Sequence, residues 1–173
     1  AGKGAWIMMQ RSFKKEITDE KIKQNMTREF LNFYSQNIDK GSKPIEGIFD
    51  FLKWAKSKNI SMAVCTNKQE RLAVDLLKKL NMYEFFEYVA GSDTFEFNKP
   101  DPRHLTNVVE IIGGDIKKTI MVGDSEVDAM SAENAQIPFV LVENGYTEKT
   151  TQEIKHGVLI KNFVNFEKII EKY

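Results

Sequence analysis

The chain has 173 residues, enough for one domain with its own hydrophobic core, or for one domain and a small appendage. Its 25 lysine and arginine residues balance 25 aspartate and glutamate residues, so it lacks the net positive charge that favours nucleic acid or an anionic membrane as a partner. No apolar stretch approaches the roughly 20 residues that cross a bilayer, and the N-terminus has no signal-peptide pattern. The single cysteine, Cys65, suits a reducing compartment, so we predict a cytoplasmic protein in which Cys65 is a buried, unreactive thiol.

Residues 1–40 are predicted to form a small helical module. Apolar residues recur at helical spacing in two stretches, Trp6, Met9 and Phe13, followed by Ile22, Met26, Phe30, Phe33 and Ile38. Thr18 and Asp19 stand before the second stretch and are suitable helix caps. We expect the apolar side chains of this module to serve in packing. The polar stretch 39–43 contains Gly41 and is the predicted linker to the rest of the chain.

From Pro44 onward, helical and strand patterns alternate along the chain. Helices are predicted over 44–55, 72–80, 105–112 and around 166–170, and strands over 60–65, 88–90, 120–122, 139–142 and 158–160. Such alternation predicts an α/β fold in which helices cover both faces of a mostly parallel, Rossmann-like sheet. We therefore divide the chain into a helical module at 1–40, which the family resemblance below makes a partial helical cap, and an α/β domain at 41–173.

Two carboxylates follow the predicted strand at 120–122. The strand breaks at Gly123, and Asp124 and Asp128 come next. A helix with one apolar side is expected to follow, marked by Val127, Met130 and Ala135. Acids between a strand and a helix lie at the carboxyl edge of an α/β sheet, where such proteins usually bind ligands. The alternative is a tight turn in which Asp128 only stabilises the start of the helix.

Two more polar stretches follow predicted strands. Thr66 and Asn67 come after the strand at 60–65, where a hydroxyl and the free N–H groups of a helix start form a natural phosphate cradle. The alternative is that one of them only caps the helix. Lys99 lies in a loop with Pro100 and Pro102, which restrict the backbone and hold the lysine extended. Here the alternative is an ordinary loop whose prolines start the next helix.

Together these residues suit phosphate chemistry with a magnesium ion. Mg²⁺ is usually held by one or two carboxylates, such as Asp124 and Asp128, together with substrate phosphate and water. A nearby Lys99 would offset the phosphate charge. Receiver domains of two-component signalling also use Asp, Thr or Ser, and Lys-Pro, but their phosphorylated aspartate precedes the other two. The order Thr66, Lys99, Asp124 argues against a receiver domain.

The same residues carry a resemblance to a known family. In motif order and spacing, the sequence resembles the haloacid dehalogenase superfamily of phosphatases, and within it the phosphoglycolate phosphatase branch. Thr66 matches the second family motif, Lys99 the third, and Asp124 and Asp128 the fourth. The resemblance implies that Thr66 and Asn67 hold the phosphate of a small phosphorylated metabolite. It also implies that Lys99 steadies phosphate and nucleophile, and that the two acids hold Mg²⁺ directly or through water.

Residues 1–40 resemble the second half of the small helical cap of this family, with Gly2-Lys-Gly4 as a glycine turn. Arg11 in this cap could reach a substrate carboxylate, and the alternative is a solvated arginine. The family's first motif, an Asp-x-Asp-Gly-Thr strand end that supplies the nucleophile and the general acid/base, has no match upstream of the cap. We therefore expect the nucleophile to lie outside this chain.

In the family, the strand that carries the first motif is the centre of the sheet. We expect a strand between those ending at Cys65 and Gly123, because buried unpaired backbone groups cost about 1–3 kcal/mol each. It could come from further N-terminal residues or from a second copy. The expected function is Mg²⁺-dependent hydrolysis of a phosphomonoester through an aspartyl-phosphate intermediate. The candidate substrate is 2-phosphoglycolate, with other phosphate esters, pyrophosphate and phosphosugar isomerisation left open. The alternative is a non-catalytic remnant that binds phosphate or a partner.

Overall fold

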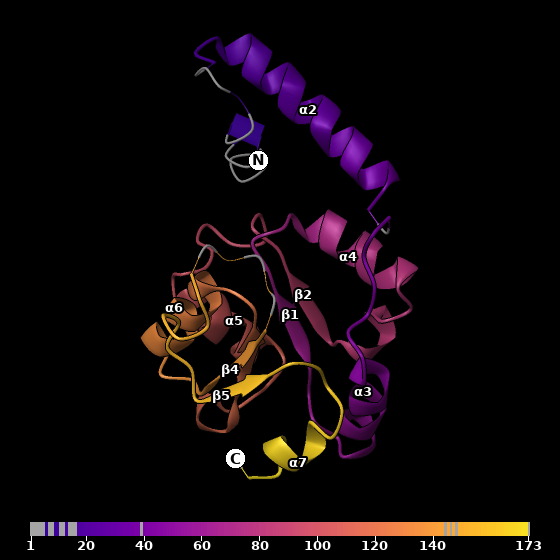
Figure 1. Ribbon diagram of the computed structural model, residues 1–173, viewed down its shortest axis with the longest axis vertical. Coiled ribbons are helices and arrows are strands. Elements are labelled where there is room, and N and C mark those ends of the chain that lie inside the picture. Colours follow the sequence, from indigo (N-terminus) through magenta and orange to yellow (C-terminus); the bar gives the residue numbers. More distant parts are fainter. Residues whose placement is uncertain are drawn as a thin grey trace.

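The computed structural model describes residues 6, 9, 10, 13, 17–38, 40–143, 145, 147 and 149–172. One long helix, α2 (Glu20–Gln36), lies apart from an α/β body that contains the described strands (Figure 1). The expectations for Gly2, Gly4 and Arg11 fall outside the described part of the chain. In that described part, no helix has the length and apolar character that would let it cross a membrane.

The body alternates strands and helices along the sequence, as predicted. Its strands are β1 (Ala63–Cys65), β2 (Tyr88–Ala90), β3 (Met121–Gly123), β4 (Phe139–Val142) and β5 (Val158–Ile160). Its helices are α3 (Ile48–Ser57), α4 (Glu70–Lys79), α5 (Arg103–Ile111), α6 (Glu126–Asn134) and α7 (Glu167–Ile170), with 3₁₀ turns η1 (Tyr83–Phe85) and η2 (Ile116–Lys118). The α/β fold class is thereby confirmed, and β2, β4 and β5 have the predicted bounds.

The strands form two parallel sheets instead of the single sheet that we predicted. β1 pairs with β2, and the other sheet has the order β3-β4-β5. Successive residues of a parallel strand direct their backbone groups to opposite edges. The Thr66 N–H bonds to Ala90 of β2, so Cys65 faces the other edge of β1, and by the same register Val122 faces away from β4. Among the described residues no strand lies between β1 and β3, so the predicted gap is present and the strand predicted to fill it is not.

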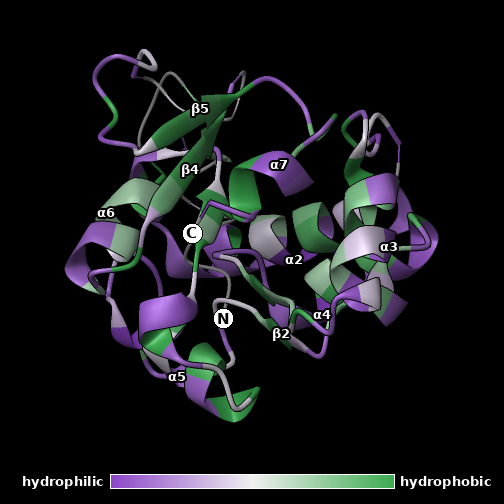
Figure 2. Cartoon of the chain, turned by 90° about the horizontal axis from the view of Figure 1, so that it is seen from below, coloured by the Kyte–Doolittle hydropathy of each residue, from purple (hydrophilic) through white to green (hydrophobic). Residues whose placement is uncertain are grey.

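Helices cover both faces of the larger sheet. All four residues of β4 are buried, with Phe139 and Leu141 in one hydrophobic core and Val140 and Val142 in another. The first core includes α5 and α6 residues, namely Leu105, Ala129 and Ala132. The second includes residues of α3 and of the C-terminal segment, namely Ile48, Phe51, Phe163 and Phe166. Figure 2 shows β4 and β5 as apolar strands beside α6 and α7.

Two predicted helices differ from the observed ones because of distant contacts. The helix predicted from Pro44 begins only at Ile48, since the N–H of Phe163 donates to the Glu46 carbonyl at 2.8 Å and holds that segment outside the helix. In α6 the expected apolar side is wrong at Met130, which is 43% exposed. The buried residues of α6 are small or polar instead, namely Asp128, Ala129, Ser131 and Ala132, because this side packs on β3 and β4.

Helix α2 has the predicted N-cap. The Asp19 carboxylate accepts hydrogen bonds from the N–H groups of Lys21 and Ile22 at 2.8 and 3.1 Å. Its apolar stripe is only partly packed as expected, since Phe33 is 67% exposed and α2 has no buried residue, whereas Ile38, just after the helix, is 2% exposed. The division of the chain at residue 40 stays a prediction.

Candidate functional site

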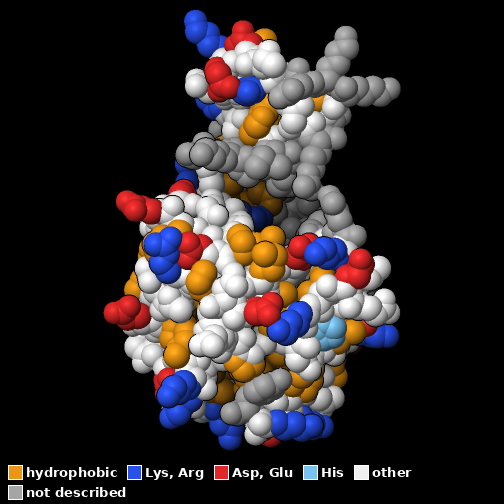
Figure 3. Space-filling view, turned by 90° about the vertical axis from the view of Figure 1, so that its left-hand side faces the viewer, with side chains coloured by type: hydrophobic (Ala, Val, Ile, Leu, Met, Phe, Trp, Pro, Cys, Tyr) orange, Lys and Arg blue, Asp and Glu red, His pale blue; other side chains and the backbone are white. Residues whose placement is uncertain are grey.

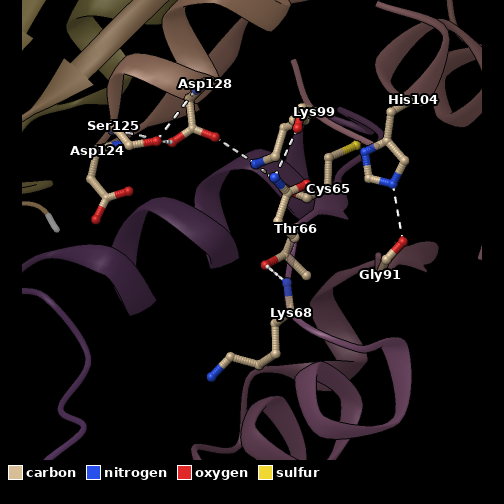
Figure 4. A network of polar contacts seen from close by, with 10 residues as sticks. Cys65, Thr66, Lys68, Gly91, Lys99, His104, Asp124, Ser125 and Asp128 are labelled. Carbon is tan, nitrogen blue, oxygen red and sulfur yellow. Dashed lines mark hydrogen bonds and ion pairs between the residues drawn. The ribbon is translucent and has the colours of Figure 1, made fainter. Parts of the chain in front are cut away.

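A buried ion pair links the loop before α5 to helix α6 and lies at the end of β1. The Lys99 Nζ lies 2.5 Å from Asp128 Oδ1 and donates a hydrogen bond to the Cys65 carbonyl at 2.7 Å, at the free edge of β1 (Figure 4). Both side chains are 8% exposed. The Lys99–Pro100 peptide bond is cis. The ammonium of Lys99, which lies in the loop before α5, thus has one partner at the end of β1 and one in α6.

Asp128 also organises the start of α6. Its Oδ2 accepts hydrogen bonds from Ser125 Oγ at 2.7 Å and from the N–H groups of Asp124 and Ser125, both at 3.2 Å. Burial by itself raises the pKa of this carboxyl, but the Lys99 ammonium and these donors outweigh it and hold the pKa below its usual range. Asp128 is therefore a carboxylate with both oxygens engaged, and it performs the helix-start role that we gave as its alternative.

Asp124 is placed differently. It is half-buried, follows β3 directly, and its carboxylate points away from the Lys99–Asp128 pair in Figure 4. A Cβ atom on Gly145 would lie 2.2 Å from the Asp124 backbone oxygen and 2.4 Å from its Cβ, so the loop after β4 lies directly on this residue. Within the described residues, no group of three or more His, Cys, Asp or Glu side chains is arranged as a metal site. A single carboxylate at a strand end nevertheless suits Mg²⁺, which needs few protein ligands.

Thr66 and Asn67 connect the same edge to Lys99. The Thr66 Oγ1 accepts a hydrogen bond from the Lys68 N–H at 3.1 Å, which leaves its own hydroxyl proton for another acceptor. The Asn67 side chain donates to the Lys99 carbonyl at 2.9 Å. Neither residue caps α4, because its N-cap is Gln69 and the Glu70 N–H donates to Asp93 at 2.8 Å. The capping alternative is thus not what the structure shows.

Cys65 lies beside this network. It is half-buried, and burial is the main cause that raises the pKa of its thiol to about 11, with Lys99 lowering it and Asp128 raising it to a smaller extent. A thiol with this pKa is protonated at neutral pH and is a poor nucleophile. The predicted unreactive role of Cys65 is consistent with this.

The sequence analysis did not identify two contacts of the site. The Lys68 ammonium donates a hydrogen bond to the Tyr34 hydroxyl of α2, and it lies 4.8 Å from the centre of the Tyr34 ring. Gly145 covers Asp124 as described above. Lys68 directly follows Thr66-Asn67, so its position in the same motif was the available signal. The approach of Gly145 to Asp124 had no signal in the local sequence.

Comparisons with known proteins place the chain in a family. Residues 7–142 match the family model of haloacid dehalogenase-like hydrolases. The chain is similar to the phosphoglycolate phosphatase of Agrobacterium fabrum, with 38% identity over 99% of the chain and 76% of the relative. It is also similar to that of Mesorhizobium japonicum, with 35% identity over 94% of the chain and 72% of the relative.

Solved structures show the same fold. A structure described as a predicted phosphoglycolate phosphatase from Haemophilus somnus superimposes with a TM-score of 0.86 at 23% identity, covering 97% of this chain and 75% of the other. The β-phosphoglucomutase of Clostridium difficile gives a TM-score of 0.75 at 24% identity, covering 90% of this chain and 68% of the other. The chain belongs to the haloacid dehalogenase-like hydrolases and is a homologue of phosphoglycolate phosphatases.

Proposed function

We propose that the protein hydrolyses a small phosphomonoester with Mg²⁺, and that 2-phosphoglycolate is its substrate. The observation that carries the proposal is the meeting of Thr66, Lys99 and Asp124 at one edge of the body, in a chain related to phosphoglycolate phosphatases. That edge faces α2 (Figure 1). On the face seen in Figure 3, the surface is hollowed between the helical segment and the body.

Each residue has a separate task in this proposal. Thr66 donates its hydroxyl proton to a phosphate oxygen, and the N–H of Asn67 adds a second donor. Lys99 provides positive charge for the phosphate and the nucleophile, and Asp128 holds its ammonium in place. Asp124 holds Mg²⁺, and Asp128 acts on the ion only through water or through Lys99. When bound, Mg²⁺ withdraws charge from the phosphate oxygens.

The nucleophile is proposed to be an aspartate on a strand that lies between β1 and β3. The facing edges of these strands carry backbone groups of Cys65 and Val122 that pair with no described strand. A parallel strand there would end beside Lys99, whose ammonium already bonds to the Cys65 carbonyl on that edge. Attack by the carboxylate oxygen of its aspartate on phosphorus would break the P–O bond to the substrate alcohol, which leaves with a proton, and would form the aspartyl-phosphate. Water would then attack phosphorus and break the acyl-phosphate P–O bond, which releases inorganic phosphate and restores the aspartate.

Phosphate release from a panel of phosphate esters tests the proposal. The full-length protein is assayed with 2-phosphoglycolate, phosphosugars and pyrophosphate, each with Mg²⁺ and with excess chelator. We expect the highest kcat/KM for 2-phosphoglycolate and loss of turnover with chelator. A full-length protein that releases no phosphate from any member but still binds inorganic phosphate would favour the non-catalytic alternative.

A further inference from the structure

We propose that Lys68 binds the carboxylate of the substrate and that Tyr34 positions the Lys68 ammonium for this contact. The inference rests on the proposed function and adds to it a residue that determines substrate class. Ligands with both a phosphate and a carboxylate would be favoured over phosphomonoesters with a neutral end.

The backbone fixes Lys68 beside the phosphate-binding hydroxyl. Its N–H donates to Thr66 Oγ1 at 3.1 Å, and its carbonyl accepts from the Ser92 N–H at 2.9 Å. Figure 4 shows its side chain leaving the loop on the side away from the Lys99–Asp128 pair. The ammonium is therefore close to the phosphate loop without being part of the buried ion pair.

The charge of Lys68 is not neutralised by the described part of the chain. Lys99 has Asp128 as its counter-charge, whereas no described carboxylate forms an ion pair with Lys68. Its polar partner is the neutral Tyr34 hydroxyl, supported by the ring face at 4.8 Å. Because its partners among the described residues are neutral, this half-buried ammonium can pair with an anionic ligand group without first losing a counter-ion.

Tyr34 sets where that group must lie. Its ring stacks on Phe30 of the same helix, with 6.0 Å between ring centres and 20° between planes. The contact with Lys68 links α2 to the loop that follows β1. The anionic end of a ligand whose phosphate sits at Thr66 would thus lie between the body and α2. A short phosphorylated acid has its two charged ends separated in this way.

Binding of two phosphonates tests the proposal. 3-Phosphonopropionate has the length and charge of 2-phosphoglycolate. 3-Hydroxypropylphosphonate has a neutral hydroxymethyl group in place of the carboxylate, and the C–P bond of both compounds resists hydrolysis. Titration calorimetry of the full-length protein with Mg²⁺ gives both Kd values. We expect the carboxylate ligand to bind about tenfold more tightly, as one charge-assisted hydrogen bond would give. Lys68→Met should weaken only that ligand and bring the ratio close to one.

Three further variants separate recognition from structure. Tyr34→Phe should reduce the Kd ratio only in part, because the ring remains. Lys58→Met, at an exposed lysine after α3, should keep the full ratio. Thermal unfolding checks that Lys68→Met is folded. If this variant shows no unfolding transition, Lys68→Gln replaces it in the same comparison.

The outcomes are distinguishable. A ratio near one in the unmodified protein would overturn the inference, as would equal weakening of both ligands in the Lys68 variant. A tenfold ratio that depends on Lys68, in a protein that releases no phosphate from 2-phosphoglycolate, would support carboxylate recognition and refute the proposed hydrolysis.

Discussion

The Lys99–Asp128 ion pair connects the loop before α5 to helix α6, across 29 residues of sequence. Replacing Lys99 by Met leaves the Asp128 carboxylate buried without its counter-charge, which costs about 3–5 kcal/mol in such pairs. We expect urea unfolding of Lys99→Met to show a loss of this size, and Lys99→Met/Asp128→Asn to recover part of it. Equal stability of the single and double variants would show that the pair is not coupled.

Arginine is not expected to replace Lys99 in function. The Lys99 Nζ fits between Asp128 and the Cys65 carbonyl, where the larger planar guanidinium has no room. Lys99→Arg should lower kcat for 2-phosphoglycolate by at least about 100-fold, the scale of one lost electrostatic contact to a transition state. Lys58→Arg serves as the matched control. Near-normal kcat in Lys99→Arg would mean that Lys99 provides only a general positive field.

Asp124 is expected to govern the response to magnesium. Asp124→Asn removes the charge of the proposed ligand and keeps its shape, so turnover should fall by roughly 100-fold or more while the thermal unfolding temperature changes little. Asp50→Asn, at an exposed position in the first turn of α3, is the control. Both are assayed over a range of Mg²⁺ concentrations. If the activity of Asp124→Asn depends on Mg²⁺ concentration as in the unmodified protein, Asp124 is not a metal ligand.

At the scale of elements, the loop after β4 holds Asp124 in place. A Cβ added at Gly145 would collide with the backbone and side chain of Asp124, and the Lys149 Nζ in the same loop pairs with Glu126 of α6 at 2.7 Å. Gly145→Ala should displace Asp124 and raise the Mg²⁺ concentration for half-maximal activity several-fold. Gly114→Ala is the control, since its added Cβ would first meet the Val109 side chain at 3.1 Å. If activity depends on Mg²⁺ concentration in the same way in both variants, the loop accommodates the added methyl group without displacing Asp124.

Helix α5 carries a titratable group in its buried side. His104 is fully buried, and its Nε2 lies 3.1 Å from the Gly91 carbonyl after β2. Burial is the main cause that lowers the pKa of His104, followed in the same direction by Lys99, while the Gly91 contact opposes it. The unfolded chain therefore binds this proton more readily than the folded one. The stability that neutral His104 confers is complete above its ordinary pKa and is lost as pH falls below it.

Chemical unfolding at pH 7.5 and pH 5.5 tests this linkage. The free energy of unfolding should decrease at the lower pH, and His104→Gln should reduce that decrease even if it lowers stability at both pH values. His156→Gln retains His104 and should keep the full decrease. If the free energy of unfolding decreases equally in the unmodified protein and in both variants, a group other than His104 causes the pH dependence.

At the scale of the whole molecule, the interrupted sheet is the feature on which the proposed activity depends. β1 and β3 are only half-buried, which is unlike strands in the centre of a continuous parallel sheet. β4, which lies between β3 and β5, is fully buried as a central strand should be. We expect a further strand between β1 and β3 in the full-length protein. Hydrogen exchange should then show protected Cys65 and Val122 amides, which face that position. Fast exchange of both amides in a folded, active protein would contradict it.

Much of the fold could be predicted because its causes are local. Alternating helical and strand periods arise within single segments, and so β2, β4, β5 and the Asp19 cap were predicted correctly. Strand ends carry functional side chains to one edge in parallel α/β proteins, which is why Thr66, Lys99 and Asp124 could be chosen before any contact was known.

Tertiary structure alone decided which of these residues touch. Periodicity tells which residues of one segment share a side, but not which distant segment covers that side. The choice of Tyr34, 34 residues away, as the partner of Lys68 and the position of Gly145 on Asp124 therefore had no local signal. The exposure of Met130 has the same origin, because packing on β3 and β4 selected the small residues of α6 for burial.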